Sequence, residues 1–206
     1  KKYFKDYDFH NLYKELLNFC TVDLSAFYFD IRKDTLYCDD IKSIKRQSCI
    51  TVLNILLNSL IRWFAPILSF TTEEIYQLVS KRNKSVHLEK FVIFPKKFEN
   101  KLLSQKWAEL IKIRDICNIS IEEKRASKEI GSSLEADLNI KLNKKFKAPL
   151  SNIDLSELCI TSNTKTSFTD QTDITVETQK AKGNKCSICW KIRTDPCGRH
   201  GCKLND

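Results

Sequence analysis

The sequence contains no methionine, only four glycines and no long apolar run. The glycines stand at positions 131, 183, 198 and 201, and none belongs to a glycine-rich phosphate loop of the Rossmann or P-loop pattern. We therefore expect no nucleotide binding by this segment. Because the chain starts with lysine and lacks methionine, we expect it to be a piece of a longer polypeptide whose start lies upstream.

Membrane-related signals are also missing. No stretch reaches the length of a membrane span, and the N-terminus lacks the charged, apolar and small-residue regions of a signal peptide. We expect a cytoplasmic protein with no membrane partner. The formal net charge of +9 over 206 residues, with a pI near 9.0, predicts a polyanionic partner, either nucleic acid or an anionic membrane surface. Nucleic acid is the favoured partner.

The clearest chemistry lies near the C-terminus, where Cys186-Ser-Ile-Cys189 is followed by Cys197-Gly-Arg-His200-Gly-Cys202. A Cys-x-x-Cys turn points two thiolates at one ion, and a second pair completes a tetrahedral shell, so we expect one structural zinc ion. The spacing leaves the fourth ligand open, because Cys197 can pair with His200 or with Cys202. Disulfides or inert thiols are the alternative, but the other five cysteines are scattered singly and the total of nine is odd.

The cysteines lie in a basic segment, with a tryptophan directly after the second cysteine. An unstacked base can lie on the indole of Trp190, and the surrounding cations attract phosphates. We predict that this zinc knuckle contacts single-stranded RNA. The alternative is that zinc only staples a tail too small to form a core. The predicted RNA-binding residues are Trp190, Lys191, Arg193, Arg199 and Lys185.

Apolar residues recur at helical spacing through most of the first 130 residues. Asp8 is placed to cap a first helix, Pro66 ends a long one, and Thr71-x-x-Glu74 indicates a capping box that opens a shorter one. Residues 85–94 are expected to be an extended crossing segment. The fold class is therefore mainly α, with a five-helix bundle at its start. The expected helices cover 9–20, 24–34, 41–64, 71–79 and 103–127.

The composition changes at Gly131. Residues 134–142 alternate apolar and polar side chains, and the string from Ile174 to Thr178 is rich in β-formers, so a small α+β module follows the bundle. The polar stretch 161–171 is expected to be a surface loop. The predicted domains are a helical bundle over 1–130, a small α+β module over 131–179, and a basic zinc-binding tail over 180–206.

Several strings along the chain are distinctive in sequence, order and spacing. They are YDFH at 7–10, NFCTVDLSAFYFD at 18–30, RWFAPILSFTTEEIY at 62–76, KEIGSSLEA at 128–136 and KCSICW at 185–190. Together they resemble the anticodon-binding helical domain and zinc-binding tail of bacterial isoleucyl-tRNA synthetases. The similarity covers almost the whole chain except the stretch near 161–171.

This resemblance implies a C-terminal portion of a class I aminoacyl-tRNA synthetase that grips the anticodon stem and loop of isoleucine tRNA. The adenylating and editing domains, with the ATP and magnesium that adenylation needs, are then expected upstream, and no catalytic residue is expected here. The family's zinc site uses two Cys-x-x-Cys pairs, which implies Cys186, Cys189 and Cys197 as ligands. His200 is the chosen fourth ligand, because it stands where the last cysteine of that pattern belongs, with Cys202 as the alternative.

Two other functions stay open at this stage. The chain could be an RNA-binding module, free-standing or differently fused, that borrows this architecture without ligase activity. It could also be a helical protein-interaction scaffold whose tail is stapled by zinc.

Overall fold

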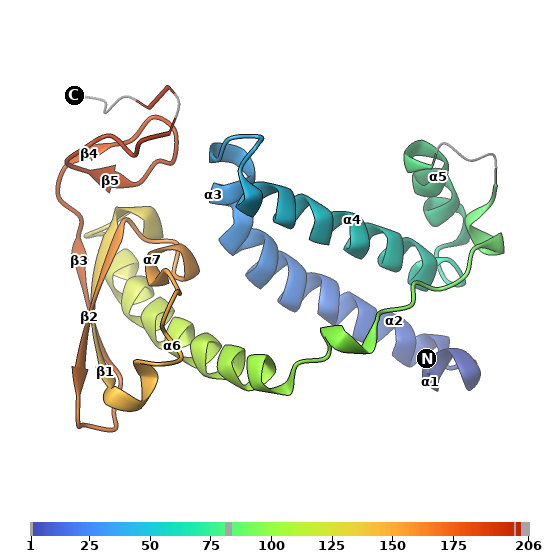
Figure 1. Ribbon diagram of the computed structural model, residues 1–206, viewed down its shortest axis with the longest axis horizontal. Coiled ribbons are helices and arrows are strands. Elements are labelled where there is room, and N and C mark those ends of the chain that lie inside the picture. Colours follow the sequence, from blue (N-terminus) through green and yellow to red (C-terminus); the bar gives the residue numbers. More distant parts are fainter. Residues whose placement is uncertain (1, 81–83, 200, 203–206) are drawn as a thin grey trace. The chain divides into compact units, whose positions relative to one another are not determined.

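The computed structural model describes residues 2–80, 84–199 and 201–202, and it divides into two compact units, Lys1–Phe98 and Glu99–Asp206 (Figure 1). The protein is mainly helical with a small mixed sheet, as the sequence predicts. The first unit is built from helices and short turns. Its helices are α1 (Lys2–Lys5), α2 (Phe9–Asn18), a π-helical segment (Phe19–Phe29), α3 (Asp30–Cys38), α4 (Ile44–Phe64), α5 (Ser69–Val79), and the 3-10 turns Val86–Leu88 and Lys96–Phe98.

The segment from α2 to α3 is one continuous helical run whose middle part has π-helical hydrogen bonding. It begins where the Asp8 carboxylate accepts a hydrogen bond from the backbone N–H of Asn11 at 3.2 Å, so the predicted cap is confirmed. The run folds back on α4, with the rings of Tyr13 and Phe64 6.4 Å apart. The apolar sets predicted as two helices therefore belong to one.

The start of α5 differs from its prediction. The helix begins at Ser69 after Leu68, so Thr71 lies inside the helix and the predicted capping box is wrong. A tight turn after α4 already directs the chain into helix, since the N–H groups of Ile67 and Leu68 both donate to the carbonyl of Phe64. The carboxylate of the neighbouring Glu73 accepts hydrogen bonds from the hydroxyl of Ser85 and the N–H of Val86, which follow the helix in the chain.

The second unit places one long helix on a three-stranded sheet. The strand order is β2-β1-β3, with β1 parallel to β2 and antiparallel to β3. Its elements are α6 (Lys101–Ala126), β1 (Ala136–Asn143), α7 (Leu155–Leu158), β2 (Asn163–Thr169), β3 (Thr175–Lys180), the hairpin strands β4 (Asn184–Lys185) and β5 (Ile192–Arg193), and the 3-10 turns Ser133–Glu135 and Lys144–Phe146.

The core of this unit lies between α6 and the sheet. Buried side chains alternate along β1, and the hydroxyls of Ser120 on α6 and Thr178 on β3 are 2.7 Å apart. The helix α6 corresponds to the predicted fifth helix of the bundle, but it packs on the sheet. The predicted five-helix bundle is therefore not confirmed. The buried apolar residues that meet here are Leu110, Ile113, Cys117, Ile121, Leu138, Ile140 and Leu142.

The two predicted strands, β1 from alternation and β3 from its content of β-formers, are confirmed, but the surface loop predicted over 161–171 is wrong. Most of that stretch is β2, an edge strand whose register with β1 runs from Asp137 opposite Asn163 to Asn143 opposite Thr169. Backbone pairing to a formed neighbour stabilises this strand although Phe168 is its one apolar side chain. Residues 89–95 follow a short 3-10 turn as irregular chain, in keeping with the predicted crossing segment.

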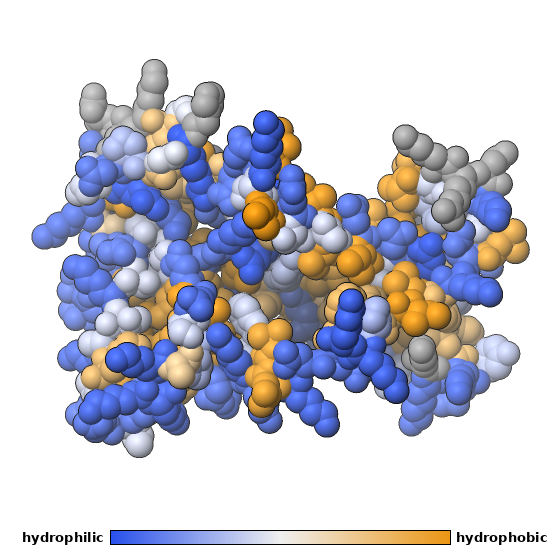
Figure 2. Space-filling model, viewed as in Figure 1, coloured by the Kyte–Doolittle hydropathy of each residue, from blue (hydrophilic) through white to orange (hydrophobic). Residues whose placement is uncertain are grey.

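Apolar side chains are exposed mainly on the helices and turns of the first unit. In the view of Figure 2 they form patches there, whereas the visible surface of the second unit is mainly hydrophilic. The most exposed include Phe70, Leu78 and Leu88, each at least 80% accessible. Among the described residues, no helix combines the length and the apolar character needed to cross a bilayer. The domain divisions predicted at residues 130 and 179 remain predictions.

Candidate zinc knuckle and nucleic-acid interface

The candidate metal site is the turn that joins β4 to β5. The N–H of Cys186 donates to the carbonyl of Lys191 at 2.9 Å, and the N–H of Trp190 donates back to the carbonyl of Cys186 at 3.0 Å. Gly183 lets the hairpin close, because a side chain at this position would collide with the backbone carbonyl of Arg193. This geometry fixes the two cysteines of the first pair on one side of the turn.

Three of the predicted ligands meet here. The sulfurs of Cys186, Cys189 and Cys197 all lie within 4.8 Å of one another, a spacing that can hold a metal ion. Zinc–sulfur bonds of about 2.3 Å in a tetrahedron place the sulfurs about 3.8 Å apart. The sulfurs of Cys186 and Cys197 are 3.6 Å apart, so the donor set fits zinc closely.

Cys202, the alternative fourth ligand, lies against Cys186 and Cys197, although it is outside the group of three sulfurs that are all within 4.8 Å of one another. Its sulfur lies 3.3 Å from that of Cys186, and it accepts a hydrogen bond from the N–H of Cys197 at 3.2 Å. The chosen fourth ligand, His200, lies outside the described residues. None of the nine cysteines forms a disulfide, and among the scattered ones Cys49, Cys117 and Cys159 are buried, as expected of small apolar side chains.

The thiols of the cluster differ in acidity. Burial opposes ionisation of Cys186, but hydrogen bonds from the N–H groups of Cys189 and Ile188 and from the Cys202 thiol lower its pKa to about 6. Burial raises the pKa of Cys189 and of Cys197 above the ordinary value. Cys186 is therefore the most easily ionised thiol of the three, and metal binding must displace protons from the others.

The knuckle is attached to the sheet by buried polar contacts. The hydroxyl of Ser162 accepts a hydrogen bond from the N–H of Ile192 at 2.6 Å and donates to the carbonyl of Leu134. The ammonium of Lys191 donates to the hydroxyl of Ser156 at 3.4 Å. Burial opposes ionisation of Asp154, but hydrogen bonds from Ser156 and the charge of Lys191 hold the pKa of that carboxyl below its ordinary value.

The five predicted RNA-binding residues differ in how far they are exposed to solvent. Trp190 is 61% exposed with a left-handed backbone (φ 60°), and the ammonium of Lys185 lies 5.2 Å from the centre of its ring. Arg193 and Arg199 are half-buried, and the Nε of Arg193 finds no hydrogen-bond partner among the described residues. Lys191 is only 7% exposed, and its ammonium donates to the hydroxyl of Ser156.

The first 141 residues match a known family. A family profile described as "Anticodon-binding domain of tRNA ligase" covers residues 1–141, which include the whole first unit, α6 and most of β1. The chain belongs to this family.

Individual relatives of this anticodon-binding domain extend the match to the knuckle. The isoleucine–tRNA ligase of Pelagibacter ubique is 63% identical over 200 residues, which cover 97% of this chain and 22% of that protein. The corresponding ligase of Agrobacterium fabrum is 38% identical over 200 residues, covering 92% of the chain and 21% of that protein. That of Rhodopseudomonas palustris is 34% identical over 204 residues, covering 92% and 20%. The chain thus spans about a fifth of the length of these relatives.

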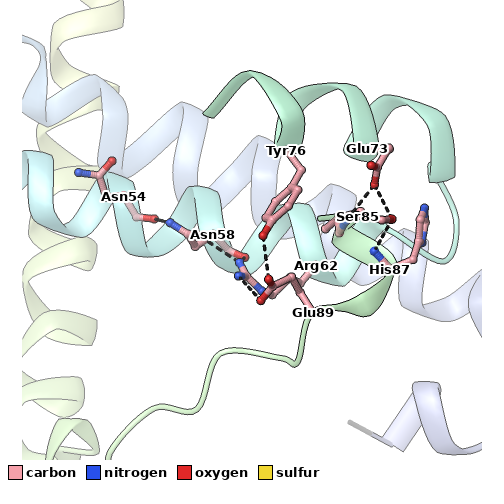
Figure 3. Close-up of polar contacts among 9 residues, drawn as sticks. Asn54, Asn58, Arg62, Glu73, Tyr76, Ser85, His87 and Glu89 are labelled. Carbon is pink, nitrogen blue, oxygen red and sulfur yellow. Dashed lines mark hydrogen bonds and ion pairs between the residues drawn. The ribbon is translucent and has the colours of Figure 1, made fainter. Parts of the chain in front are cut away.

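The anticodon-binding domain also contains a polar cluster between α4 and α5 that sequence reasoning missed (Figure 3). The guanidinium of Arg62 donates to the side-chain oxygen of Asn58 at 3.0 Å and to the carboxylate of Glu89 at 3.3 Å. The hydroxyl of Tyr76 donates to the same carboxylate at 2.8 Å. The spacing of Asn54, Asn58 and Arg62, four residues apart along one helix, was the available signal.

Proposed function

We propose that this chain is the tRNA-binding part of an isoleucine–tRNA ligase and that it holds the anticodon stem and loop of isoleucine tRNA. One observation carries the proposal: the match to isoleucine–tRNA ligases at up to 63% identity runs through both the anticodon-binding domain and the knuckle. The charge of +9 agrees with a polyanionic partner.

In this proposal the ligase reaction belongs to residues outside these 206. Adenylation of isoleucine would use ATP and magnesium in a class I catalytic domain of the same polypeptide, beside an editing domain, in the cytoplasm. The chain itself has neither a His-x-Gly-His string nor a Lys-Met-Ser-Lys loop. Its own task would be to position the tRNA.

We further propose that the knuckle binds one zinc ion through Cys186, Cys189, Cys197 and Cys202. The short distance from the Cys202 sulfur to that of Cys186 supports Cys202 as the fourth ligand. The bound ion would cross-link the two halves of a hairpin that has too little apolar side chain to form a core. It would keep the exposed Trp190 at a fixed position.

The proposed RNA contacts on the knuckle are Trp190, Lys185, Arg193 and Arg199. The exposed indole offers a face to an unstacked base, while the cations neutralise phosphates. Lys191 is not among these proposed contacts, because the residue is only 7% exposed and its ammonium donates to Ser156.

Titration of labelled isoleucine tRNA with the zinc-loaded chain at several salt concentrations tests the proposal. We expect affinity to fall linearly with salt on a log-log scale, with a slope of about 0.7–0.9 for each phosphate neutralised. A tRNA with a different anticodon should bind more weakly. Equal affinity for both tRNAs would favour a general RNA-binding module. Absence of binding would favour a helical interaction scaffold.

A further inference from the structure

A hollow lies between α4 and α5 of the first unit, far from the knuckle in the sequence. It encloses about 500 Å³, within the range of about 300–1,000 Å³ that small-ligand sites occupy. Its walls combine amide, guanidinium and hydroxyl groups with aliphatic side chains. The lining residues are Asn54, Leu57, Asn58, Arg62, Tyr76, Val79 and Ser80.

The polar wall is held in place before any ligand arrives. Arg62 donates to the carbonyl oxygen of Asn58 at 2.7 Å, to its side-chain oxygen at 3.0 Å, and to Glu89 at 3.3 Å. The hydroxyl of Tyr76 donates to the carboxylate of Glu89, and the centre of the Tyr76 ring lies 5.9 Å from the guanidinium carbon of Arg62. Only 12% of the Arg62 side chain and 19% of the Glu89 side chain are exposed. The amide of Asn58 is therefore presented by a rigid, largely buried framework (Figure 3).

These groups still have hydrogen-bonding capacity. The side-chain nitrogen of Asn58 donates to the carbonyl of Asn54 at 2.8 Å, which uses one of its two hydrogens. Its oxygen accepts from Arg62 and keeps a second lone pair. The Nε of Arg62 is buried and finds no partner among the described residues. A donor and an acceptor on one exposed amide can pair with the edge of a planar heterocycle.

The lining of the hollow also includes apolar side chains. Val79 at the end of α5 is 53% exposed and Leu57 on α4 is 36% exposed, although both are aliphatic. A nucleobase also combines apolar and polar surfaces, since its faces are apolar and its edge carries hydrogen-bond donors and acceptors. A phosphate fits less well, because the guanidinium of Arg62 is already neutralised by Glu89.

We propose that this hollow binds one unstacked base of the RNA, with the amide of Asn58 reading its edge and with Val79 and Leu57 against its face. The inference rests on the proposed function and adds to it a base-reading site far along the chain from the knuckle. Arg62, Glu89 and Tyr76 act as positioning residues: Arg62 holds the side-chain oxygen of Asn58, Glu89 holds Arg62, and Tyr76 holds Glu89.

The test compares Asn58→Ala with the matched control Asn18→Ala. Both asparagines are exposed helical residues of the first unit, but Asn18 lies outside the hollow. The probe is a labelled stem-loop RNA with the anticodon loop of isoleucine tRNA. We expect Asn58→Ala to weaken binding by about 5- to 150-fold without changing the salt slope, because the lost contact is uncharged. Asn18→Ala should change affinity less than about 2-fold.

A second set of RNAs, each with one loop base replaced by an abasic sugar, identifies the base. One of these RNAs should bind the wild type and Asn58→Ala equally, because the contact is already missing. Val79→Phe, which enlarges a side chain that lines the hollow, should show the same pattern, and circular dichroism checks that each variant is folded. If wild type binds but Asn58→Ala binds equally well, the inference is overturned while the proposed function stands. A loss that is the same for every abasic RNA also overturns it. If wild type does not bind the RNA, the proposed function itself fails.

Discussion

The sulfur of Cys202 lies 3.3 Å from that of Cys186, although sixteen positions separate the two residues in sequence. This contact is the reason for proposing Cys202 as the fourth zinc ligand. We expect the wild-type chain to hold about one zinc ion, and Cys202→Ala to lose most of it. The ligands must be deprotonated and brought together, so removal of one sulfur weakens the whole site. Metal content after dialysis against a weak chelator measures the effect.

The control for this experiment is His200→Ala, which should keep its zinc. The reverse result, with zinc lost from His200→Ala and kept by Cys202→Ala, would return the fourth position to the histidine. In either case the first unit should melt as in the wild type, because its core contains no residue of the knuckle.

Lys191→Met is expected to reduce stability more than RNA affinity. The substitution keeps an unbranched side chain but removes the charge beside Asp154 and the hydrogen bond to Ser156. A cost of about 1 kcal/mol in the free energy of unfolding is expected for one such contact. Urea denaturation measures it, with Lys182→Met, at an exposed position of the same segment, as the control. A lower salt slope for tRNA binding with unchanged stability would show that Lys191 contacts phosphate after all.

The knuckle residues that do face solvent should divide into two kinds. Lys185→Ala is expected to reduce the log-log salt slope of tRNA binding by about 0.7–0.9, because one phosphate contact is lost. Trp190→Ala should weaken binding by about 1–3 kcal/mol with little change of slope, because a stacked base carries no charge. Fluorescence titration at several salt concentrations separates the two. If both variants bind like the wild type while fully loaded with zinc, the knuckle is only a structural staple.

Glu73 gives the first unit a pH-dependent contact. Its carboxylate accepts hydrogen bonds from Gln77, Ser85 and the N–H of Val86 at 2.7, 2.8 and 2.9 Å, and these bonds lower its pKa below the ordinary 4.5. Because the pKa is lower in the folded state, the stabilisation is present above the unfolded-state pKa and is lost as the pH falls through the folded-state value. Glu73→Gln should therefore melt at a lower temperature than the wild type at neutral pH.

The difference in melting temperature between Glu73→Gln and the wild type should shrink as the pH falls below about 4.3. Glu74→Gln, at the next and exposed position of α5, is the matched control and should differ little from the wild type at any pH. A difference that stays constant down to acid pH would show that the Glu73 contact is independent of its charge.

The sequence by itself determined the features that depend on neighbours along the chain. Helical periodicity and the cap at Asp8 located α2, and Pro66 located the end of α4, because helices are specified by residues three and four positions apart. Alternation located β1, and a run of β-forming residues located β3. The Cys-x-x-Cys spacing predicted a metal site, since the loop that presents two thiolates is itself local.

Only the tertiary structure decided the features that join distant residues. The polar stretch over Asn163–Thr169 became β2 because β1 offered it backbone partners, which no side-chain pattern records. Lys191 is buried because Ser156 and Asp154 lie across from it. Arg62 meets Glu89 from 27 positions away, and Cys202 approaches Cys186 through a turn in the tail. Each depends on which surfaces pack together, and that packing is set by the free energy of the whole fold instead of by local preference.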